Sequence, residues 1–375
     1  MKVKTFLKSA RIENFKAIQD SHTVSFTPLT VFIGNNGSGK SSLIEGLETY
    51  RTIIADGLDA AMSRWFGFEH VWNKQSRHNL PAAGFFENPM KFTWAGQTEK
   101  VTAKAHMIVN TKPGFNALFI QEEQARLKDC REINRVGDLI NGKEKIEPGR
   151  SGLPGEARDF VLGWQFLSLM PANMGTPAPK KMATAGTLLL NRDGSNLAQY
   201  LSDIRDKDTS AFNGIIDAMR FVLDYAGDFQ PVETQEIQRT MYVSMKEKRF
   251  SIPGWMLSTG TVRVLALLAV LRNPNPPRVL IIEEIENGLD PRTIHLVLEE
   301  IRIAVQSGQT QVIMTTHSPY VLNLLPLPTI VLVERDTGGD PVFWRPAGEH
   351  DVQEWAKRFT PGELYTTGRF RRPRQ

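Results

Sequence analysis

The sequence has 375 residues but a single cysteine, Cys130, so no disulfide can form within the chain. This excludes the small secreted proteins that depend on disulfides, and it predicts a reducing, cytoplasmic location with a buried and inert thiol. Long hydrophobic runs are missing too: the longest, VLALLAVL at 264–271, is far below the roughly 20 residues of a membrane-spanning helix. The first residues, MKVKTFLKSARIENF, also lack the apolar core of a secretion signal. We therefore expect a protein that does not contact membranes.

Charge of one sign is not in large excess either. The chain has 45 lysines and arginines against 41 acidic residues, a net charge of +4. This mild positive balance permits nucleic-acid binding without requiring it. Hydrophobic residues make up 41% and charged residues 23%, as in ordinary globular proteins, and the length fits one large domain or two of average size.

Continuous apolar segments near both ends of the chain predict buried strands. LTVFIG at 29–34 ends in glycine and leads into helical spacing over 41–58. In the last third of the chain, strand-like segments alternate with helical ones, an order that predicts parallel pairing with helical crossovers in an α/β fold. The expected strands there are RVLIIEE (278–284), TQVIMTTH (310–317) and TIVLVERD (329–336), and the expected helices are 259–271 and 291–308.

The middle of the chain has weaker patterns. Residues 125–165 are polar and indicate helix. Residues 170–186 are rich in Pro, Gly, Ala and Lys and indicate a loop. The segment 193–227 has helical spacing again, with Ser195 or Asn196 as candidate caps at its start.

The strongest motif is GNNGSGKS at 34–41, which matches G-x-x-x-x-G-K-[ST] between an expected strand and an expected helix. Its glycines let the backbone curl so that successive N–H groups point at phosphate oxygens, and the positive end of the following helix adds to this field. We expect Lys40 to bind the outer phosphates and the Ser41 hydroxyl to bind Mg²⁺. The alternative is a glycine-rich turn without a ligand. The residues expected to bind nucleotide are Asn35, Asn36, Gly37, Ser38, Gly39, Lys40, Ser41 and Ser42.

A second acidic site for the metal and the attacking water is expected near any such phosphate loop. VLIIEEIENGLDP at 279–291 supplies one, because four apolar residues run directly into adjacent glutamates. We expect Glu283 to face Mg²⁺ and Glu284 to orient or deprotonate the hydrolytic water. The alternative is a strand that ends in charge at the surface. Glu286 is expected to be a solvated loop charge.

These segments together resemble the ABC-type ATPases. LSTGTVR at 257–263 resembles the family's signature loop, LSGGQ: Ser258 and Gly260 match it, whereas the threonines that follow each of them do not. By the same resemblance Asp290 falls on the D-loop aspartate, and His317 in IMTTHSP falls on the switch histidine. The resemblance also implies a Q-loop glutamine at the metal, for which Gln75 in VWNKQSRHN is the candidate.

Further segments resemble the RecF/OLD branch of these ATPases, whose members act on DNA or in bacterial defence against phage. They are ENGLDP, the signature S-T-G-T, DGSNLA at 193–198 and FTPGELYTTGRF at 359–370. The resemblance covers residues 65–190 poorly. OLD nucleases carry a Toprim nuclease domain after the ATPase, and the sequence leaves no room for one after His317. We therefore expect any nuclease or toxin to be a separate protein.

The resemblance implies an ABC-ATPase head with a mainly parallel phosphate-loop sheet, an antiparallel β subdomain and an inserted helical lobe. We expect residues 1–130 to form the N-terminal ATPase part, 131–228 the helical lobe and 229–375 the C-terminal ATPase part. In such ATPases two heads enclose two ATP–Mg²⁺, which implies a homodimer or a larger homo-oligomer. Each site would then combine the phosphate loop of one copy with Ser258 and Gly260 of the other. Asp290 would communicate across the interface, and His317 would sense the γ-phosphate.

Several functions are open on this basis. The first is an ATP-driven sensor or regulator in anti-phage defence with a separate effector. The second is a DNA-repair head, to which the basic end GRFRRPRQ at 368–375 would contribute unless it is only a solvated terminus. The third is the ATP-binding subunit of a transporter, which the altered signature and the long middle region disfavour. The fourth is a nucleotide-dependent scaffold with negligible turnover.

Overall fold

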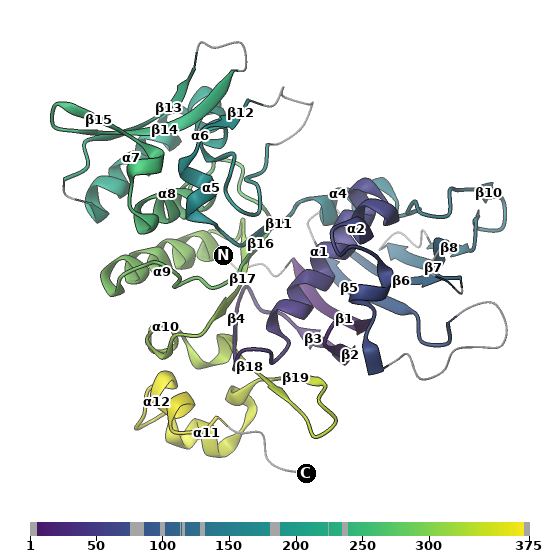
Figure 1. Cartoon of the computed structure of the whole chain (residues 1–375). Helices are drawn as coiled ribbons and strands as arrows, with labels where there is room; N and C mark the ends of the chain where they lie inside the picture. The colour runs from purple at the N-terminus through teal and green to yellow at the C-terminus, as the bar shows by residue number, and fades with distance from the viewer. Residues whose placement is uncertain are drawn as a thin grey trace. The chain divides into compact units, whose positions relative to one another are not determined.

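The chain is described by a computed structural model (Figure 1). The described residues are 6–75, 86–97, 102–112, 114, 117–127, 132–180, 188–223, 225–234 and 239–370. The expectation for Cys130 and that for the last five residues of the basic terminus lie outside this part of the chain.

Contacts divide the chain into two compact units, which are described separately. The P-loop unit contains Thr5–Trp164, Leu327–Arg358 and the residues after Thr366, and the signature unit contains Gln165–Pro326 and Phe359–Thr366. These boundaries differ from the expected divisions after residues 130 and 228, so the three-part division stays a prediction. No helix in the described residues is long and apolar enough to cross a membrane.

The P-loop unit contains a large antiparallel sheet. Its order is β10-β9-β8-β7-β6-β5-β1-β2, with β3 also paired to β1. Side chains alternate between buried and more exposed along β1 and β5, as the period of a half-buried strand requires. The strands are β1 (Leu7–Phe15), β2 (Ile18–Asp20), β3 (Val24–Ser25), β5 (Met90–Gln97), β6 (Thr102–Thr111), β7 (Leu118–Leu127), β8 (Glu132–Val136), β9 (Leu139–Ile140) and β10 (Glu144–Lys145).

Helix α1 (Lys40–Asp56) packs against one face of this sheet (Figure 1). Gly46 makes the close approach possible, because a Cβ there would lie 2.4 Å from Cδ1 of Ile12 on β1. The short helices α2 (Leu58–Ser63) and α3 (Phe68–Val71) follow, and α4 (Gly155–Leu162) completes the unit's helices before residue 164.

The same unit holds three further strands: β4 (Leu29–Ile33), β18 (Ile330–Arg335) and β19 (Pro341–Trp344). β4 pairs parallel with β18, and β18 pairs antiparallel with β19. Every residue of β4 is buried, as its continuous apolar sequence predicts. The short helix α11 (His350–Trp355) follows β19.

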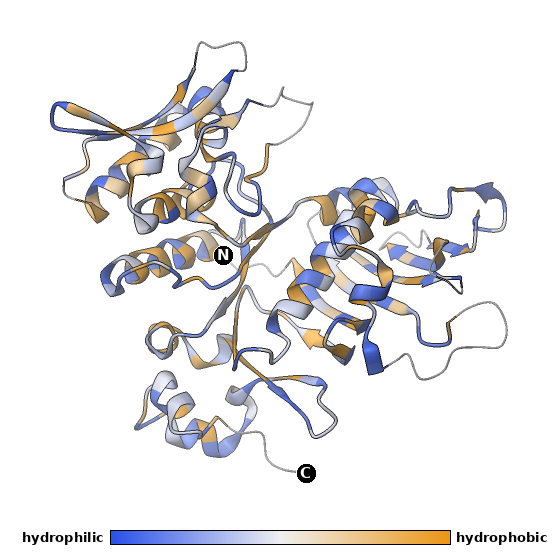
Figure 2. Ribbon diagram, viewed as in Figure 1, coloured by the Kyte–Doolittle hydropathy of each residue, from blue (hydrophilic) through white to orange (hydrophobic). Residues whose placement is uncertain are grey.

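In the signature unit, β11 (Trp164–Leu167), β16 (Val279–Ile282) and β17 (Gln311–Thr316) lie in that order, with β16 and β17 parallel. Helix α8 (Thr259–Leu271) begins and ends where the sequence predicts and is buried from Thr261 onward. Helix α9 (Pro291–Gln306) connects the parallel strands as a crossover, and Figure 2 shows hydrophobic and hydrophilic residues alternating along it. Two short helices, α10 (Pro319–Asn323) and α12 (Pro361–Thr366), contact each other.

A second sheet in the signature unit is antiparallel and contacts the helical segment expected over 193–227. That segment forms α6 (Leu197–Lys207) and α7 (Thr209–Val222), separated by Asp208, whose side chain caps α7 by accepting from the N–H of Ala211. The remaining elements are β12 (Ala178–Pro179), β13 (Asp228–Glu233), β14 (Thr240–Glu247), β15 (Phe250–Pro253) and the short helix α5 (Pro171–Gly175).

The helical interpretation of 125–165 is wrong for most of that stretch. Strand β7 continues to Leu127, and β8, β9 and β10 follow before the single helix α4. The cause is tertiary: Arg135 on β8 is fully buried, and its guanidinium donates to the carbonyls of Gly137, Glu147 and Pro148. The polar segment wraps around one buried cation, which local periodicity does not reveal.

An aromatic cluster fixes α1 and α4 on the sheet of the P-loop unit. Trp94 on β5 and Tyr50 on α1 have ring centroids 6.4 Å apart, and the Trp164 ring lies 5.7 Å from both Trp94 and Phe160 of α4. Trp164 is fully buried. Such offset and edge-to-face pairs stabilise beyond the area that they bury.

We predict that Trp164→Ala lowers the free energy of unfolding by about 3–5 kcal/mol, because it leaves a cavity at the centre of this cluster. Urea unfolding followed by circular dichroism measures the loss. Trp255→Ala is the matched control, because Trp255 is 52% exposed, and we expect less than about 1 kcal/mol there. Equal losses in the two variants would contradict a central role for the cluster.

Candidate functional site

The phosphate-loop motif lies between β4 and α1, as its sequence context predicts. Helix α1 begins at Lys40, and Gly39 before it adopts a left-handed conformation with φ 108°. No described side chain caps this helix start, so its first N–H groups point toward the loop as anion-binding groups. The Lys40 side chain is buried, and its Nζ donates to the carbonyls of Gly34 at 2.7 Å and Asn35 at 3.0 Å. Ser41 is exposed, which leaves its hydroxyl accessible from solvent.

The glycines of the loop are required by close packing as well as by backbone angle. A Cβ on Gly39 would lie 2.3 Å from Cγ of Pro341, the first residue of β19. A Cβ on Gly34 would lie 2.1 Å from the carbonyl oxygen of Val333 on β18. The β18–β19 hairpin therefore presses directly on the loop, and any side chain at these glycines would push the two apart.

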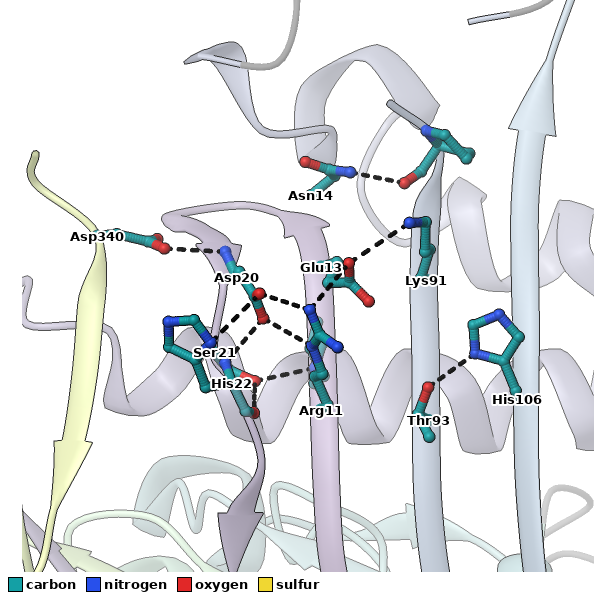
Figure 3. Close-up of polar contacts among 12 residues, drawn as sticks. Arg11, Glu13, Asn14, Asp20, Ser21, His22, Lys91, Thr93, His106 and Asp340 are labelled. Carbon is teal, nitrogen blue, oxygen red and sulfur yellow. Dashed lines mark hydrogen bonds and ion pairs between the residues drawn. The ribbon is translucent and has the colours of Figure 1, made fainter. Parts of the chain in front are cut away.

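Arg335 and Asp340, at the turn of this hairpin, fasten it on two sides. Arg335 donates to the carbonyl of Gly37 in the phosphate loop at 2.8 Å and to that of Gly339 in the turn. The Asp340 carboxylate accepts from the backbone N–H of Asp20 at 2.9 Å (Figure 3). Asp20 in turn pairs with Arg11 on β1. Local pattern does not reveal these contacts, because the bonds that join the hairpin to the loop and to Asp20 link residues about 300 positions apart.

Gln75 reaches the same hairpin. Its backbone N–H donates to Asn73 Oδ1 at 2.9 Å, and its side-chain Nε2 donates to the carbonyl of Gly338 at 3.3 Å. Since Gly338 belongs to the turn that Arg335 joins to the loop, Gln75 lies in the neighbourhood of the phosphate loop within one unit. Its role at the metal stays a prediction.

The acidic pair follows β16, as expected, at the carboxyl end of the parallel strands. The N–H of Glu283 donates to the carbonyl of Leu167 on β11, and the N–H of Glu284 donates to Thr315 Oγ1 on β17 at 2.8 Å. Glu284 has φ 50°, a left-handed conformation that is rare outside glycine, and its side chain is exposed. The Glu283 side chain is only 12% exposed, and its carboxylate pairs with Arg192.

Arg263 on α8 holds this strand end in place and was missed at the level of sequence. It is 2% exposed, and its guanidinium donates to the carbonyl of Leu169 at 3.0 Å and to those of Glu283 and Glu284. Burial lowers the pKa of Arg263, and the charges of Glu284 and Glu286 oppose that shift. A sequence signal did exist: Arg263 is the single charge within the apolar run TVRVLALLAVL, and a buried charge needs partners.

The expectation that Glu286 is a solvated charge is wrong. Its Oε1 accepts from the backbone N–H of His317 at 2.5 Å, and its Oε2 is buried without a hydrogen-bond partner among the described residues. The reason is Ile285, which is fully buried and bonds through its N–H to the Thr315 carbonyl, so the loop turns inward. The Glu286 carboxylate therefore links the acidic loop to the segment after β17. His317 itself is exposed.

The signature and D-loop segments contact each other within the signature unit. Ser258 caps α8: its Oγ accepts from the N–H of Thr261 at 3.1 Å and lies 2.8 Å from the hydroxyl of Thr261. This gives Thr261, a departure from the usual signature, a structural role. A Cβ on Gly260 would lie 2.8 Å from the carbonyl oxygen of Gly288, so the glycine is required for the two loops to meet. Ser258 is exposed, as is Gly288.

Asp290 caps α9. Its Oδ1 accepts from the N–H groups of Arg292 at 2.9 Å and Thr293 at 3.1 Å, and Oδ2 bonds the Thr293 hydroxyl. The hydrogen bond from the Thr293 side chain holds the pKa of this carboxyl below its usual range. Asp290 thus has a structural task in its own chain, and its role across an interface stays a prediction.

Ser41 and Glu283 offer a hydroxyl and a carboxylate, the hard oxygen ligands that Mg²⁺ prefers. Within the described ranges, no group of three or more His, Cys, Asp or Glu residues could hold a metal. Mg²⁺ in proteins usually keeps few protein ligands and is bound together with nucleotide phosphates, which each of these donors suits by its chemistry. The signature unit contains Ser258, Gly260, Glu283, Glu284, Asp290 and His317, and the P-loop unit contains Asn35, Asn36, Gly37, Ser38, Gly39, Lys40, Ser41, Ser42 and Gln75.

Comparison with known proteins agrees with this geometry. Residues 192–323 match the family described as "AAA domain, putative AbiEii toxin, Type IV TA system", and residues 6–50 match the family described as "AAA ATPase domain". An ATP/GTP phosphatase of Helicobacter pylori is 20% identical over 346 residues, which cover 85% of this chain and 87% of that protein. Nod factor export ATP-binding protein I of Sinorhizobium fredii is 38% identical over 71 residues, which are 19% of this chain and 20% of that protein.

Among solved structures, the SmcHead bound to the C-winged helix domain of ScpA is similar in fold. The TM-score is 0.57 at 13% identity, and the match covers 90% of this chain and 97% of that one. The likeness confirms the expected α/β fold of an ABC-type ATPase head. The two family matches, the similarity to the ATP/GTP phosphatase and the phosphate-loop motif together support a P-loop ATPase, an enzyme that hydrolyses ATP.

Proposed function

We propose that two copies of the chain close on two ATP–Mg²⁺ at composite sites, and that the closed assembly regulates a separate effector protein in defence against phage. One observation carries the composite site: the signature and D-loop segments touch through Gly260 and Gly288 and are exposed around Ser258. Exposed glycine-rich loops beside an exposed helix N-terminus suit the phosphates of a nucleotide held by a second copy. Trp255 and Met256, 52% and 70% exposed beside the signature loop, add apolar surface that a second copy would cover.

In this proposal each group has one task. Lys40 and the N–H groups at the start of α1 bind the outer phosphates, and Ser41 and Glu283 face the metal, which neutralises phosphate charge when bound. Gln75 contributes an amide oxygen there. Glu284 accepts a proton from the attacking water or orients it, which an exposed carboxylate on a fixed backbone can do. Loss of the γ-phosphate removes contacts that only the closed form makes, so hydrolysis shifts the population toward separated copies.

The regulatory part of the proposal is supported by two comparisons. The family that matches 192–323 is described as a putative AbiEii toxin of a type IV TA system, which favours defence over housekeeping roles. The SmcHead of similar fold was solved bound to a domain of another protein, ScpA, so a head of this fold can bind a separate protein. We therefore place the effector, a nuclease or toxin, on a separate chain, and we place both proteins in the cytoplasm.

A DNA-repair role is the second candidate, and the outer face of the large sheet gives it little support. Three of its basic side chains are paired with acids: Arg11 with Glu13 and Asp20, Lys91 with Glu13, and Arg126 with Glu132. A face of alternating charge neutralises few phosphates. Turnover stimulated by duplex DNA would favour repair. The transporter reading has less support still, because the match to the export protein covers 19% of this chain.

We predict that Lys40→Ala weakens ATP binding at least about tenfold, because the loop loses its positive charge at the outer phosphates. Isothermal titration calorimetry with ATP and Mg²⁺ measures the affinity. Lys207→Ala is the matched control, since that lysine pairs with Asp203 on the surface of α6 and lies outside the loop. An unchanged affinity in Lys40→Ala would contradict the phosphate-loop assignment.

We predict that Glu284→Gln binds ATP normally but hydrolyses it about 10²–10⁴-fold more slowly, because the amide cannot accept the proton of the attacking water. The closed assembly should then accumulate, and size-exclusion chromatography with light scattering in ATP should show a doubled or larger mass. Glu299→Gln, an exposed change on α9, is the control. Normal turnover in Glu284→Gln would show that Glu284 is not the base. A monomeric mass in ATP would refute the composite site.

We predict that Arg263→Met lowers the free energy of unfolding by about 2–4 kcal/mol and lowers kcat more than it raises KM. The buried carbonyls lose their donor, and the backbone that aims Glu284 loses its anchor. Steady-state kinetics and urea unfolding separate the two effects. Arg272→Met is the control, because Arg272 bonds Glu300 and the carbonyl of Gly214 away from the acidic pair. A folded Arg263→Met with unchanged kcat would show that Arg263 does not position Glu284.

A further inference from the structure

The DGSNLA segment, which the proposed catalytic roles leave unexplained, belongs to a tightly bonded turn over residues 191–196. The N–H of Asn191 donates to Asn196 Oδ1 at 2.7 Å, and the Asn191 side chain donates to Ser195 Oγ at 2.9 Å. The N–H of Ser195 donates to Asp193 Oδ1 at 3.0 Å. Asn196 precedes α6 without capping it through its side chain, because that side chain closes the turn instead. The turn is therefore locked by its own polar residues.

The turn is also fastened to the chain that leaves β11. The N–H of Ser168 donates to the carbonyl of Arg192 at 2.8 Å, and the N–H of Met170 donates to the carbonyl of Asp193 at 3.0 Å. Gly194 has φ 79°, and a Cβ there would lie 2.4 Å from Sδ of Met174, so a larger residue would not fit. Because the backbone on both sides of Arg192 is fixed, its side chain is presented from a rigid support.

Arg192 points at the acidic pair. Its Nη2 donates to Oε1 of Glu283, with the two side chains 30% and 12% exposed. A charge-assisted bond in this partly desolvated place is stronger than a surface ion pair. Glutamate is one methylene longer than the aspartate usual at this position in the ABC-type ATPases that the sequence resembles. The longer side chain extends the reach of the carboxylate from the end of β16 toward the turn.

We propose that Arg192 is a positioning residue that competes with Mg²⁺ for the Glu283 carboxylate and thereby sets the Mg²⁺ concentration that nucleotide binding requires. The inference rests on the proposed function, in which Glu283 faces the metal. One carboxylate oxygen cannot hold the guanidinium and a divalent cation in the same geometry, and the two cations also repel each other. Mg²⁺ arriving with ATP therefore either displaces Arg192 from Oε1 or binds Oε2 against the repulsion of the nearby guanidinium, whereas a chain without this arginine would present the carboxylate without that cost.

The test is Arg192→Gln in the full chain. A fluorescent ATP analogue is held at fixed concentration, Mg²⁺ is titrated, and the Mg²⁺ concentration at half-maximal nucleotide binding is read from the fluorescence. We expect that concentration to fall about three- to tenfold, as the loss of one partly buried charged contact implies. Arg205→Gln is the matched control, because Arg205 on α6 bonds Gln230 and Asp206, away from the acidic pair. This control should leave the Mg²⁺ concentration at half-maximal binding, called the half-point below, unchanged.

A double-mutant cycle separates competition from an indirect effect. In a Glu283→Gln background there is no carboxylate to contest, so adding Arg192→Gln should not shift the half-point further. A full additional shift there would overturn the inference, as would an unchanged or raised half-point in the single variant. If Arg192→Gln melts at a lower temperature than the unaltered protein, Arg192→Lys serves instead. Lysine keeps the positive charge but lacks the planar guanidinium. A half-maximal Mg²⁺ concentration between the values of the unaltered protein and Arg192→Gln supports competition, whereas no shift overturns it.

The unaltered protein distinguishes this inference from the proposed function. Nucleotide binding that does not respond to Mg²⁺ at all would overturn both, because Glu283 would then have no metal to face. Binding that depends on Mg²⁺ with the same half-point in Arg192→Gln would overturn only the role of Arg192.

Discussion

The burial of one guanidinium is the constraint on which the acidic pair and the signature loop of the signature unit depend. A charge as buried as that of Arg263 needs hydrogen-bond partners, and backbone carbonyls just beyond β11 and β16 accept from both of its terminal NH₂ groups. The same helix, α8, starts at the cap formed by Ser258. The signature loop and the acidic pair are thus both bonded to α8, which begins at the first and holds the second through Arg263.

In the P-loop unit, the phosphate loop is held in place by residues outside the loop. Its loop must offer backbone N–H groups to an anion, so it cannot fill its own interior with side chains. Rigidity comes from outside, through the hairpin that packs on Gly34 and Gly39 and through the Arg335 bond to Gly37. Glycine is required at these positions by the packing of a neighbour as much as by backbone angle.

Much of the fold could be predicted from local pattern, because a strand or helix whose buried side follows its own periodicity shows that periodicity in its apolar residues. The phosphate loop, the bounds of α8 and the strand before Glu283 are of this kind. The rest depended on contacts between distant residues. Arg135 draws a polar stretch into strands and turns, and Glu286 turns inward because buried Ile285 precedes it. Hydrophobic periodicity does not predict a buried charged side chain that bonds to backbone carbonyls. A lone arginine within an apolar helix, such as Arg263, does indicate one.

The acidic pair carries two different environments on adjacent residues, and this difference decides their chemistry. Glu284 is exposed on a left-handed backbone, which is held by the bond from its N–H to Thr315 Oγ1 and by the bond from Arg263 to its carbonyl. Its carboxylate accepts a long bond of 3.4 Å from Asn287 and can reach a water at little cost. Glu283 is partly desolvated and already neutralised by Arg192, so a cation must compete for it. In the proposed mechanism these environments suit different roles: Glu284 acts on the water, and Glu283 binds the metal in competition with Arg192. The turn at 191–196 holds the Arg192 side chain that contacts Glu283, so under this proposal the DGSNLA segment acts on the metal site.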